Sequence, residues 1–198
     1  MGFVVNSYDT CVVNKVIDGK QCTISWHVDD LKLSHKDPAV LTSIIKSLDD
    51  KYGTIMPLSI SRGKVHEYLG MTFDFSKTGE VQITMYDHID DILEGVPTIY
   101  KSGIGCATAA PSNLYTVREP CEGNELLLDN EREEYHTLTA QCLYISKRGR
   151  PDLQTSIAFH CTRVRNPTQD DQKKLGRTIR YLESTRFLPL ILSLNKHG

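Results

Sequence analysis

The sequence predicts an α+β fold, in which an antiparallel sheet comes first and helices come last. The early part alternates β-branched and polar residues around tight-turn signals, and the last third repeats apolar residues at helical spacing. No repeat or low-complexity tract separates the two patterns. The 198 residues are 39% hydrophobic, which is enough for one moderate domain or two small lobes with a core.

The first predicted strands flank an Asp-Gly dipeptide at 18–19. Residues 11–17 and 20–28 are rich in β-branched residues, and Asp-Gly between two such runs is a strong hairpin signal. A second reversal is expected at Asp29-Asp30, because the LKLS segment that follows alternates like a strand with one buried face. The sequence therefore predicts three short antiparallel strands with two adjacent carboxylates at one tip.

A helix is expected after the third strand, where Asp37 can cap the first turn and Pro38 suits the first helical position. Its apolar stripe would cover one face of the sheet, and Gly53 is expected to end it in a left-handed conformation. A further hairpin with its loop at 77–79 and a short helix over 86–94 should follow.

Most prolines and many Gly, Asn and Ser residues fall in residues 95–130, which predicts a linker. Helices are expected over 131–147 and 152–164, and a third begins at Thr168, whose spacing to Asp171 resembles a capping box. The chain then reads LPLILSL, which we expect to form an edge strand without a partner.

Composition argues against several classes of protein. No apolar run approaches the roughly 20 residues of a membrane span, and no signal peptide is recognisable, so we expect an intracellular, cytoplasmic protein with no membrane partner. The six cysteines form no Cys-x-x-Cys pair and indicate reduced thiols. Residues 145–198 carry a net charge of +7 and residues 1–144 one of −9. The basic end would face an anionic partner or form solvated helix faces.

Two adjacent carboxylates repel each other unless a cation lies between them. Magnesium, or manganese in its place, prefers such oxygen ligands, and polymerases use paired ions to activate the attacking hydroxyl. Aspartate is also favoured at turns for its own sake, and the same dipeptide recurs at 49–50, 90–91 and 170–171. A metal site at Asp29 and Asp30 is therefore a hypothesis that depends on its surroundings.

Four motifs in a fixed order strengthen this hypothesis. The chain reads HVDD at 27–30, YLG at 68–70, LYISKRGRPD at 143–152 and RTIRYLEST at 177–185. The set resembles the C-terminal part of the polymerase domain of copia-type LTR retrotransposon reverse transcriptases, whose acidic turn usually reads Tyr-Val-Asp-Asp. The resemblance extends over about residues 2–194.

The resemblance implies a partial palm, an antiparallel sheet with packed helices and a primer-grip-like hairpin, over residues 1–94. A linker over 95–130 and a helical thumb/connection-like region over 131–198 would follow, ending at the start of a missing ribonuclease H domain. The intact parent would be an RNA-directed DNA polymerase that acts on an RNA/DNA primer-template and dNTPs, with the remainder of the Pol polyprotein as partner, in a virus-like particle. Because the upstream palm aspartate and the fingers do not fit before Asp29, we expect the fragment to be inactive alone.

The resemblance also implies roles for single residues in the acidic turn. Asp29 and Asp30 match the catalytic pair, of which at least the first is a magnesium ligand. His27 and Val28 precede them, and His27 replaces the usual tyrosine that contacts the primer-template. Near neutral pH an imidazole at this position could carry a charge.

Tyr68, Leu69 and Gly70 match the hairpin that holds the 3′ end of the primer, although they equally fit an ordinary half-buried strand. Basic residues of the last third are candidate phosphate contacts, and those of the last helix are expected largely on its solvent side. These contacts are Lys147, Arg148, Arg150, Lys173, Lys174, Arg177 and Arg180. Arg150 with Pro151 and Asp152 also fits a structural role at a helix start, which we favour.

Two other interpretations stay open. A non-catalytic nucleic-acid-binding or assembly module, such as a domesticated remnant, would use only the basic helices. A divalent-cation site of unrelated chemistry would combine His27, Asp29, Asp30 and His35, a spacing that matches no established metal motif.

Overall fold

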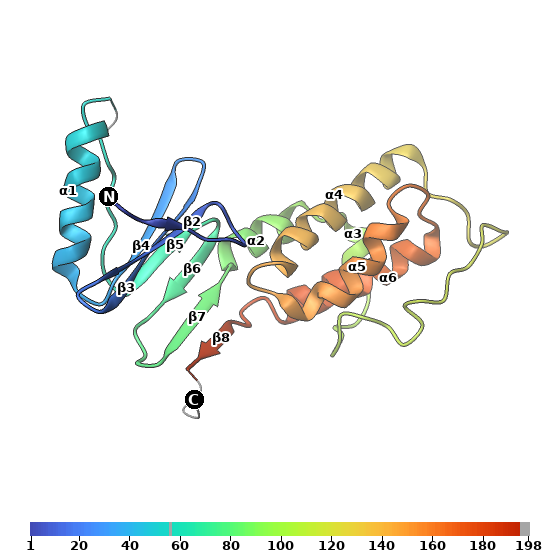
Figure 1. The fold of residues 1–198 in the computed structure, drawn as a ribbon. Coiled ribbons are helices and arrows are strands. Elements are labelled where there is room, and N and C mark those ends of the chain that lie inside the picture. The colour runs from blue at the N-terminus through green and yellow to red at the C-terminus, as the bar shows by residue number, and fades with distance from the viewer. Residues whose placement is uncertain (56, 195–198) are drawn as a thin grey trace. The chain divides into compact units, whose positions relative to one another are not determined.

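The computed structural model describes residues 1–55 and 57–194 and confirms an α+β fold (Figure 1). The chain divides into two compact units, Met1–Gly63 and Lys64–Gly198, here called the N-terminal and the C-terminal unit. Each unit contains a four-stranded antiparallel sheet. Within the described residues, every helix is too short or too polar to cross a membrane.

The sheet of the N-terminal unit has the strand order β1-β2-β3-β4. The strands span Val4–Val5, Val12–Ile17, Lys20–His27 and Asp30–Ser34. The hairpin predicted at 18–19 is confirmed, because Asp18 and Gly19 both have positive φ angles, 50° and 71°, as a type I′ turn requires. The second predicted reversal is also confirmed, since His27 pairs with Asp30 across β3 and β4.

One face of this sheet is covered by α1, Pro38–Tyr52, as predicted (Figure 1). Val13, Ile24 and Leu33 lie opposite one another across three strands and form an apolar cluster with Ile44 of the helix. Asp37 caps the helix, since its carboxylate accepts the Ala39 N–H at 2.8 Å. The opposite face is mostly polar, with Asn14, Thr23 and Lys32 beside Val12 and Val16.

The end of α1 differs from the prediction. Gly53 is not left-handed: its φ is −62°, because its N–H still donates to the Asp49 carbonyl at 2.7 Å. Glycine provides space here instead, since a Cβ would lie 2.7 Å from that same carbonyl oxygen. The glycine is therefore needed for close approach and not for a positive φ.

The sheet of the C-terminal unit has the order β5-β6-β7-β8. Its strands span Val65–Tyr68, Met71–Asp74, Glu80–Thr84 and Leu190–Ser193. The predicted hairpin with its loop at 77–79 joins β6 to β7, and a second hairpin, which was not predicted, turns at Leu69-Gly70. The expected lack of a partner for LPLILSL is wrong, because β8 pairs with β7 from far back in the chain.

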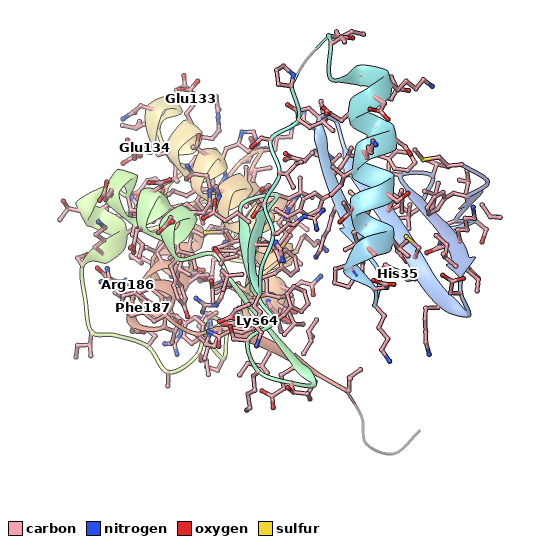
Figure 2. All side chains as sticks on the ribbon, turned by 90° about the vertical axis from the view of Figure 1, so that its left-hand side faces the viewer. His35, Lys64, Glu133, Glu134, Arg186 and Phe187 are labelled. Atoms are coloured by element: carbon pink, nitrogen blue, oxygen red, sulfur yellow. The ribbon has the colours of Figure 1, made fainter. Side chains whose placement is uncertain are left out.

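Two contacts hold the segment between α6 and β8, which leads the chain back to β7. Arg186 forms an ion pair with Asp90 of α2 at 3.4 Å, and the Tyr86 hydroxyl donates to the Phe187 carbonyl at 3.0 Å. Arg186 and Phe187 lie next to each other on this return path (Figure 2). They place Leu190 at the open edge of the sheet, opposite Ile83.

The helices of the C-terminal unit follow the predicted pattern. They are α2 (Tyr86–Gly95), α3 (Thr98–Lys101), α4 (Asp129–Ser146), the 3₁₀ turn η1 (Pro151–Leu153), α5 (Gln154–Arg163) and α6 (Gln169–Ser184). The capping box is confirmed, since the Thr168 and Asp171 side chains each accept the backbone N–H of the other. Leu175, Ile179 and Leu182 of α6 are fully buried in the core, as expected.

The segment predicted as a linker packs against the helices. Residues 96–128, which we call the strap, contain only the short helix α3 and run along α6. Tyr100, Ala109, Leu114 and Leu127 of the strap are buried. The strap is thus part of the folded C-terminal unit.

The core of this unit contains a neutral histidine. His160 of α5 is fully buried, and its Nδ1 lies 2.6 Å from the Tyr135 hydroxyl. Burial, with a smaller contribution from the charge of Lys174, lowers the pKa of His160 to about 3. Burial also raises the pKa of Tyr135 far above its ordinary value.

We expect the free energy of unfolding to fall as the pH drops from about 6.5 toward 3. Below its ordinary pKa His160 takes up a proton in the unfolded chain but stays neutral in the fold. Lower pH therefore stabilises the unfolded state relative to the folded state. The part due to this residue is about 3 kcal/mol between pH 7 and pH 4. Urea unfolding across this pH range should show this loss of unfolding free energy for the wild type and not for His160→Asn, whose amide keeps a hydrogen-bond acceptor. Equal pH slopes in both proteins would contradict this assignment.

Candidate functional site

The predicted metal ligands lie at the tip of the β3–β4 hairpin in the N-terminal unit. His27 ends β3 and Asp30 begins β4, so Val28 and Asp29 form a two-residue loop. All four side chains are exposed. The two carboxylates are therefore adjacent, Asp29 in the loop and Asp30 at the start of β4, and both are open to solvent.

The backbone of this turn is strained at Val28. Its φ is +54°, a value that β-branched residues rarely adopt and that costs on the order of 1–3 kcal/mol. The Val28 side chain is 87% exposed, so burial of the side chain does not offset this cost. Strain of this kind concentrates at functional sites, which is a second reason, independent of charge, to regard the turn as a candidate site.

The alternation along β4 sets the direction of Asp30. Leu33 packs toward α1, so Asp30 and Lys32, two residues apart, share the opposite, polar face of the sheet. The Asp30 carboxylate therefore points away from the apolar core of the unit. Asp29 extends from the loop itself.

Asp29 and Asp30 are not joined by further possible metal ligands in the described part of the chain. In residues 1–55 and 57–194, no group of three or more His, Cys, Asp or Glu side chains converges. The hypothesis that joins His35 to His27 and the two aspartates is therefore wrong. His35 follows the far end of β4 and lies beside the start of α1 (Figure 2).

The YLG motif forms the second predicted site, in the C-terminal unit. Tyr68 pairs with Met71, and Leu69 and Gly70 form a two-residue loop with φ angles of 54° and 69°. The hydroxyl of Tyr144, in α4, donates to the Leu69 carbonyl at 2.9 Å. The second and third of the four sequence motifs are therefore in direct contact.

Two further side chains contact the ring of Tyr144. The Arg148 guanidinium carbon lies 3.7 Å from the ring centroid, and the His88 ring of α2 is centred 4.9 Å away. Arg148 also donates to the Tyr144 carbonyl at 3.2 Å. A cation this close to an aromatic face is attracted by the ring.

The third and fourth motifs also contact each other. Arg150 is only 2% exposed, and its guanidinium donates twice to Asp152, at 3.0 and 2.8 Å. It also donates to the Thr185 carbonyl and hydroxyl at 3.1 and 2.7 Å, and the Tyr181 hydroxyl donates to Asp152 at 2.9 Å. Burial alone would raise the pKa of Asp152, but the Arg150 hydrogen bonds hold it below its ordinary value. This geometry agrees with the structural role that we favoured for Arg150.

The expectation that the basic residues of α6 lie largely outside is wrong for Lys174, which is 4% exposed, and Arg177 and Arg180 are half-buried. Their side chains donate to backbone carbonyls of the strap. The bonds are Arg180 to Ser102, Arg177 to Thr108 and Lys174 to Thr116, at 2.9, 3.2 and 2.7 Å. Lys174 also pairs with Asp170 at 2.8 Å.

Of the seven predicted phosphate contacts, Lys147 and Lys173 are exposed and Arg148 is half-buried. In the described part of the chain these three form no ion pair with a carboxylate. Lys147 and Lys173 are therefore the residues of this set best able to meet an anionic ligand, whereas Arg148 also donates to the Tyr144 carbonyl and packs on its ring. Arg150, Lys174, Arg177 and Arg180 already have protein partners.

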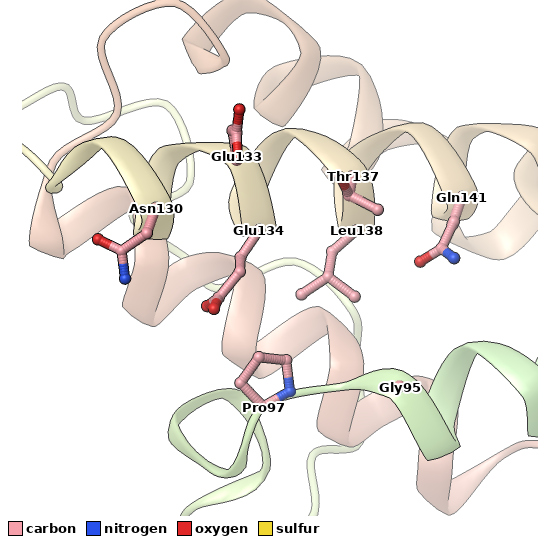
Figure 3. A pocket seen from close by; sticks show the side chains of 8 residues that line it. All are labelled: Gly95, Pro97, Asn130, Glu133, Glu134, Thr137, Leu138 and Gln141. Atoms are coloured by element: carbon pink, nitrogen blue, oxygen red, sulfur yellow. The ribbon is translucent and has the colours of Figure 1, made fainter.

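An open groove of about 430 Å³ lies between α4 and the segment that follows α2 (Figure 3). Glu133 and Glu134 line it together with Pro97 and Leu138. Carboxylates repel the phosphates of a nucleic acid backbone. The negative charge of the groove therefore disfavours binding of phosphate groups there.

The chain is similar to a transposon protein. It is 23% identical over 167 residues to the putative transposon Ty5-1 protein of Saccharomyces cerevisiae. The match covers 84% of this chain and 50% of that protein, so the chain spans about half the length of its curated relative. No family model matches the sequence. No solved structure matches it either.

Tyr144 was not predicted as a site residue. It lies within the LYISKRGRPD motif, but its contact with Leu69 joins residues 75 positions apart. Helical spacing shows only that Tyr144 lies near an apolar stripe and not what its hydroxyl meets. The same holds for Thr185, the acceptor for Arg150.

We expect Arg150→Ala to destabilise the C-terminal unit by about 3 kcal/mol, because it leaves Asp152 without its buried partner. Lys147→Ala removes an exposed charge with no ion pair and should change stability by less than about 0.5 kcal/mol. Urea unfolding midpoints of both variants measure the difference. Similar midpoints would show that the Arg150 network contributes little to stability.

Proposed function

We propose that this chain is a fragment of the RNA-directed DNA polymerase, or reverse transcriptase, of a copia-type retrotransposon. The observation that carries the proposal is the pair Asp29 and Asp30 at the tip of a strained, two-residue hairpin. The ordered motifs and the similarity to a transposon protein over 84% of the chain support it. RNA/DNA primer-template and dNTPs are the proposed substrates of the intact parent.

The donor set at the turn fits part of a magnesium or manganese site. Asp29 and Asp30 offer hard oxygen ligands, and magnesium is commonly held by one or two carboxylates together with substrate phosphates. When bound, the ion would lower the pKa of the attacking hydroxyl and offset charge on the phosphates. No third carboxylate joins the pair within the described residues, so we propose that the fragment alone does not extend a primer.

The C-terminal unit would hold the nucleic acid backbone. Lys147, Arg148 and Lys173 are the proposed phosphate contacts, since Lys147 and Lys173 are exposed and none of the three forms an ion pair with a carboxylate in the described part of the chain. Contacts of this kind do not read sequence and weaken with salt. The Leu69-Gly70 turn is proposed to meet the end of the primer.

We expect the double variant Asp29→Asn/Asp30→Asn to lose weak Mn²⁺ binding. The change removes both negative charges and keeps the size of the side chains, so the hairpin should persist. The matched control is Asp49→Asn/Asp50→Asn, which removes an exposed pair from α1 of the same unit. Titration of the free-Mn²⁺ electron paramagnetic resonance signal, in the presence of primer-template and a dNTP, measures the binding.

Equal Mn²⁺ binding by the two double variants would argue against a metal site at the turn. Primer extension by the wild-type chain with magnesium and dNTPs should be absent. Extension that disappears in Asp29→Asn would support the polymerase but overturn the proposed dependence on a missing carboxylate.

A second candidate is a non-catalytic nucleic-acid-binding or assembly module. It is favoured by the absence of a third carboxylate at the turn within the described residues, together with three available basic side chains. On this function, duplex binding would survive Asp29→Asn unchanged. The two candidates therefore differ in whether the acidic turn contributes.

We expect the wild-type chain to bind duplex with an affinity that falls steeply with salt, and Lys147→Ala/Lys173→Ala to reduce the slope of log K against log salt by about 2. The control Arg132→Ala removes an exposed arginine already paired with Asp129 at 3.0 Å and should change the slope much less. Fluorescence anisotropy over a salt series measures both. Binding that does not depend on salt would contradict a phosphate interface.

A further inference from the structure

The Leu69-Gly70 turn has an anchored inner side and an open outer side. On the inner side, the Leu69 carbonyl accepts the Tyr144 hydroxyl at 2.9 Å. On the outer side, the N–H groups of Leu69 and Gly70 have no acceptor within the described residues, and Gly70 is exposed. Two adjacent free N–H groups in a turn are suited to bind an anion such as phosphate.

The anchor depends on glycine at position 70. Its φ of +69° is one that side chains rarely adopt, and a Cβ there would lie 3.2 Å from the Tyr144 hydroxyl. Leu69 also has a positive φ, 54°, so the turn has two residues in an uncommon conformation. The half-buried Tyr144 side chain therefore donates its hydrogen bond to a turn in which both residues have an uncommon backbone conformation.

Tyr144 itself is held from more than one side. Its ring packs on the core of the C-terminal unit and contacts His88 and Arg148, at 4.9 and 3.7 Å. A ring fixed in this way gives its hydroxyl a defined position. It also couples the turn to Arg148, one of the three available basic residues.

We propose that Tyr144 is a positioning residue that holds the Leu69-Gly70 turn in the geometry that presents its free N–H groups to a terminal phosphate of the primer strand. The inference rests on the proposed function, because it assumes that the turn meets a primer. It adds that the recognition of the primer end depends on a hydroxyl that does not touch nucleic acid. Tyr144 acts only through Leu69, so it is not a catalytic residue.

The test compares two labelled DNAs of equal length, a primer-template with a recessed 3′ end and a blunt duplex, by anisotropy at several salt concentrations. The wild-type chain should bind the recessed substrate more tightly. Tyr144→Phe keeps the ring contacts and removes the hydroxyl, so this preference should fall roughly two- to tenfold, the effect of one lost hydrogen bond. Blunt-duplex affinity and salt slope should stay unchanged.

The matched control is Tyr181→Phe, which removes another tyrosine hydroxyl from the same unit, the one that donates to Asp152 at 2.9 Å. It should leave the preference for the recessed end intact. Gly70→Ala, which crowds the hydroxyl and strains the turn, should reproduce the effect of Tyr144→Phe. The double variant should lose no more than either single variant.

Four outcomes would overturn the inference. Tyr144→Phe could keep the full preference, or Tyr181→Phe could reduce it equally, which would indicate general loosening of the unit. A wild-type chain that binds both DNAs equally would refute end recognition while duplex binding stands. A chain that binds neither DNA would refute the proposed nucleic-acid function, and the inference with it.

Discussion

The C-terminal unit depends on how α6 satisfies the backbone of the strap. Residues 96–128 lack a sheet and contain a single short helix, yet several of them are buried, so their carbonyl groups need donors other than water. Thr178 of α6 donates to the carbonyl of buried Ala109 at 3.1 Å, and Arg180 donates to that of buried Tyr100 at 3.4 Å. Arg177 and Lys174 donate to carbonyls of the exposed residues Thr108 and Thr116. Gly176 lets α6 and the strap approach each other closely, because a Cβ at this position would lie 3.2 Å from the Tyr100 carbonyl oxygen. The charge of α6 is thus used largely inside the unit.

This arrangement changes the meaning of the basic C-terminal third. A net charge of +7 over residues 145–198 suggests an electropositive face, but a cation that already donates to carbonyls or to a carboxylate contributes less to binding phosphate. Arg150 is the clearest case, since both Asp152 and Thr185 accept from it and it is nearly inaccessible. The proposed interface is correspondingly smaller than the sequence predicts and centres on Lys147, Arg148 and Lys173.

Hydrogen bonds link three of the four sequence motifs. YLG contacts LYISKRGRPD through Tyr144, and the end of LYISKRGRPD contacts RTIRYLEST through Arg150. The side chains of HVDD are exposed instead, and its valine has a strained backbone. A motif of exposed side chains that costs backbone energy is one for which we propose a ligand. This contrast is the physical basis for assigning function to Asp29 and Asp30 before the other motifs.

Local chemistry was sufficient for most elements of the fold. The Asp18-Gly19 hairpin, the cap at Asp37, the Thr168 capping box and the buried stripe of α6 all follow from turn and helix preferences of residues close in sequence. The acidic tip follows in the same way, because its pairing is set by the adjacent strands.

Apart from the end of α1, where Gly53 bonds to Asp49 four residues earlier, the mispredicted features depend on residues far apart in the chain. β8 pairs with β7, the strap covers Lys174, and the Tyr144 hydroxyl of α4 donates to the Leu69 carbonyl. Periodicity shows which side of an element is apolar, but it does not show which distant backbone group will need a hydrogen bond. That need arises only when the elements pack and exclude water, so it is decided by the tertiary structure.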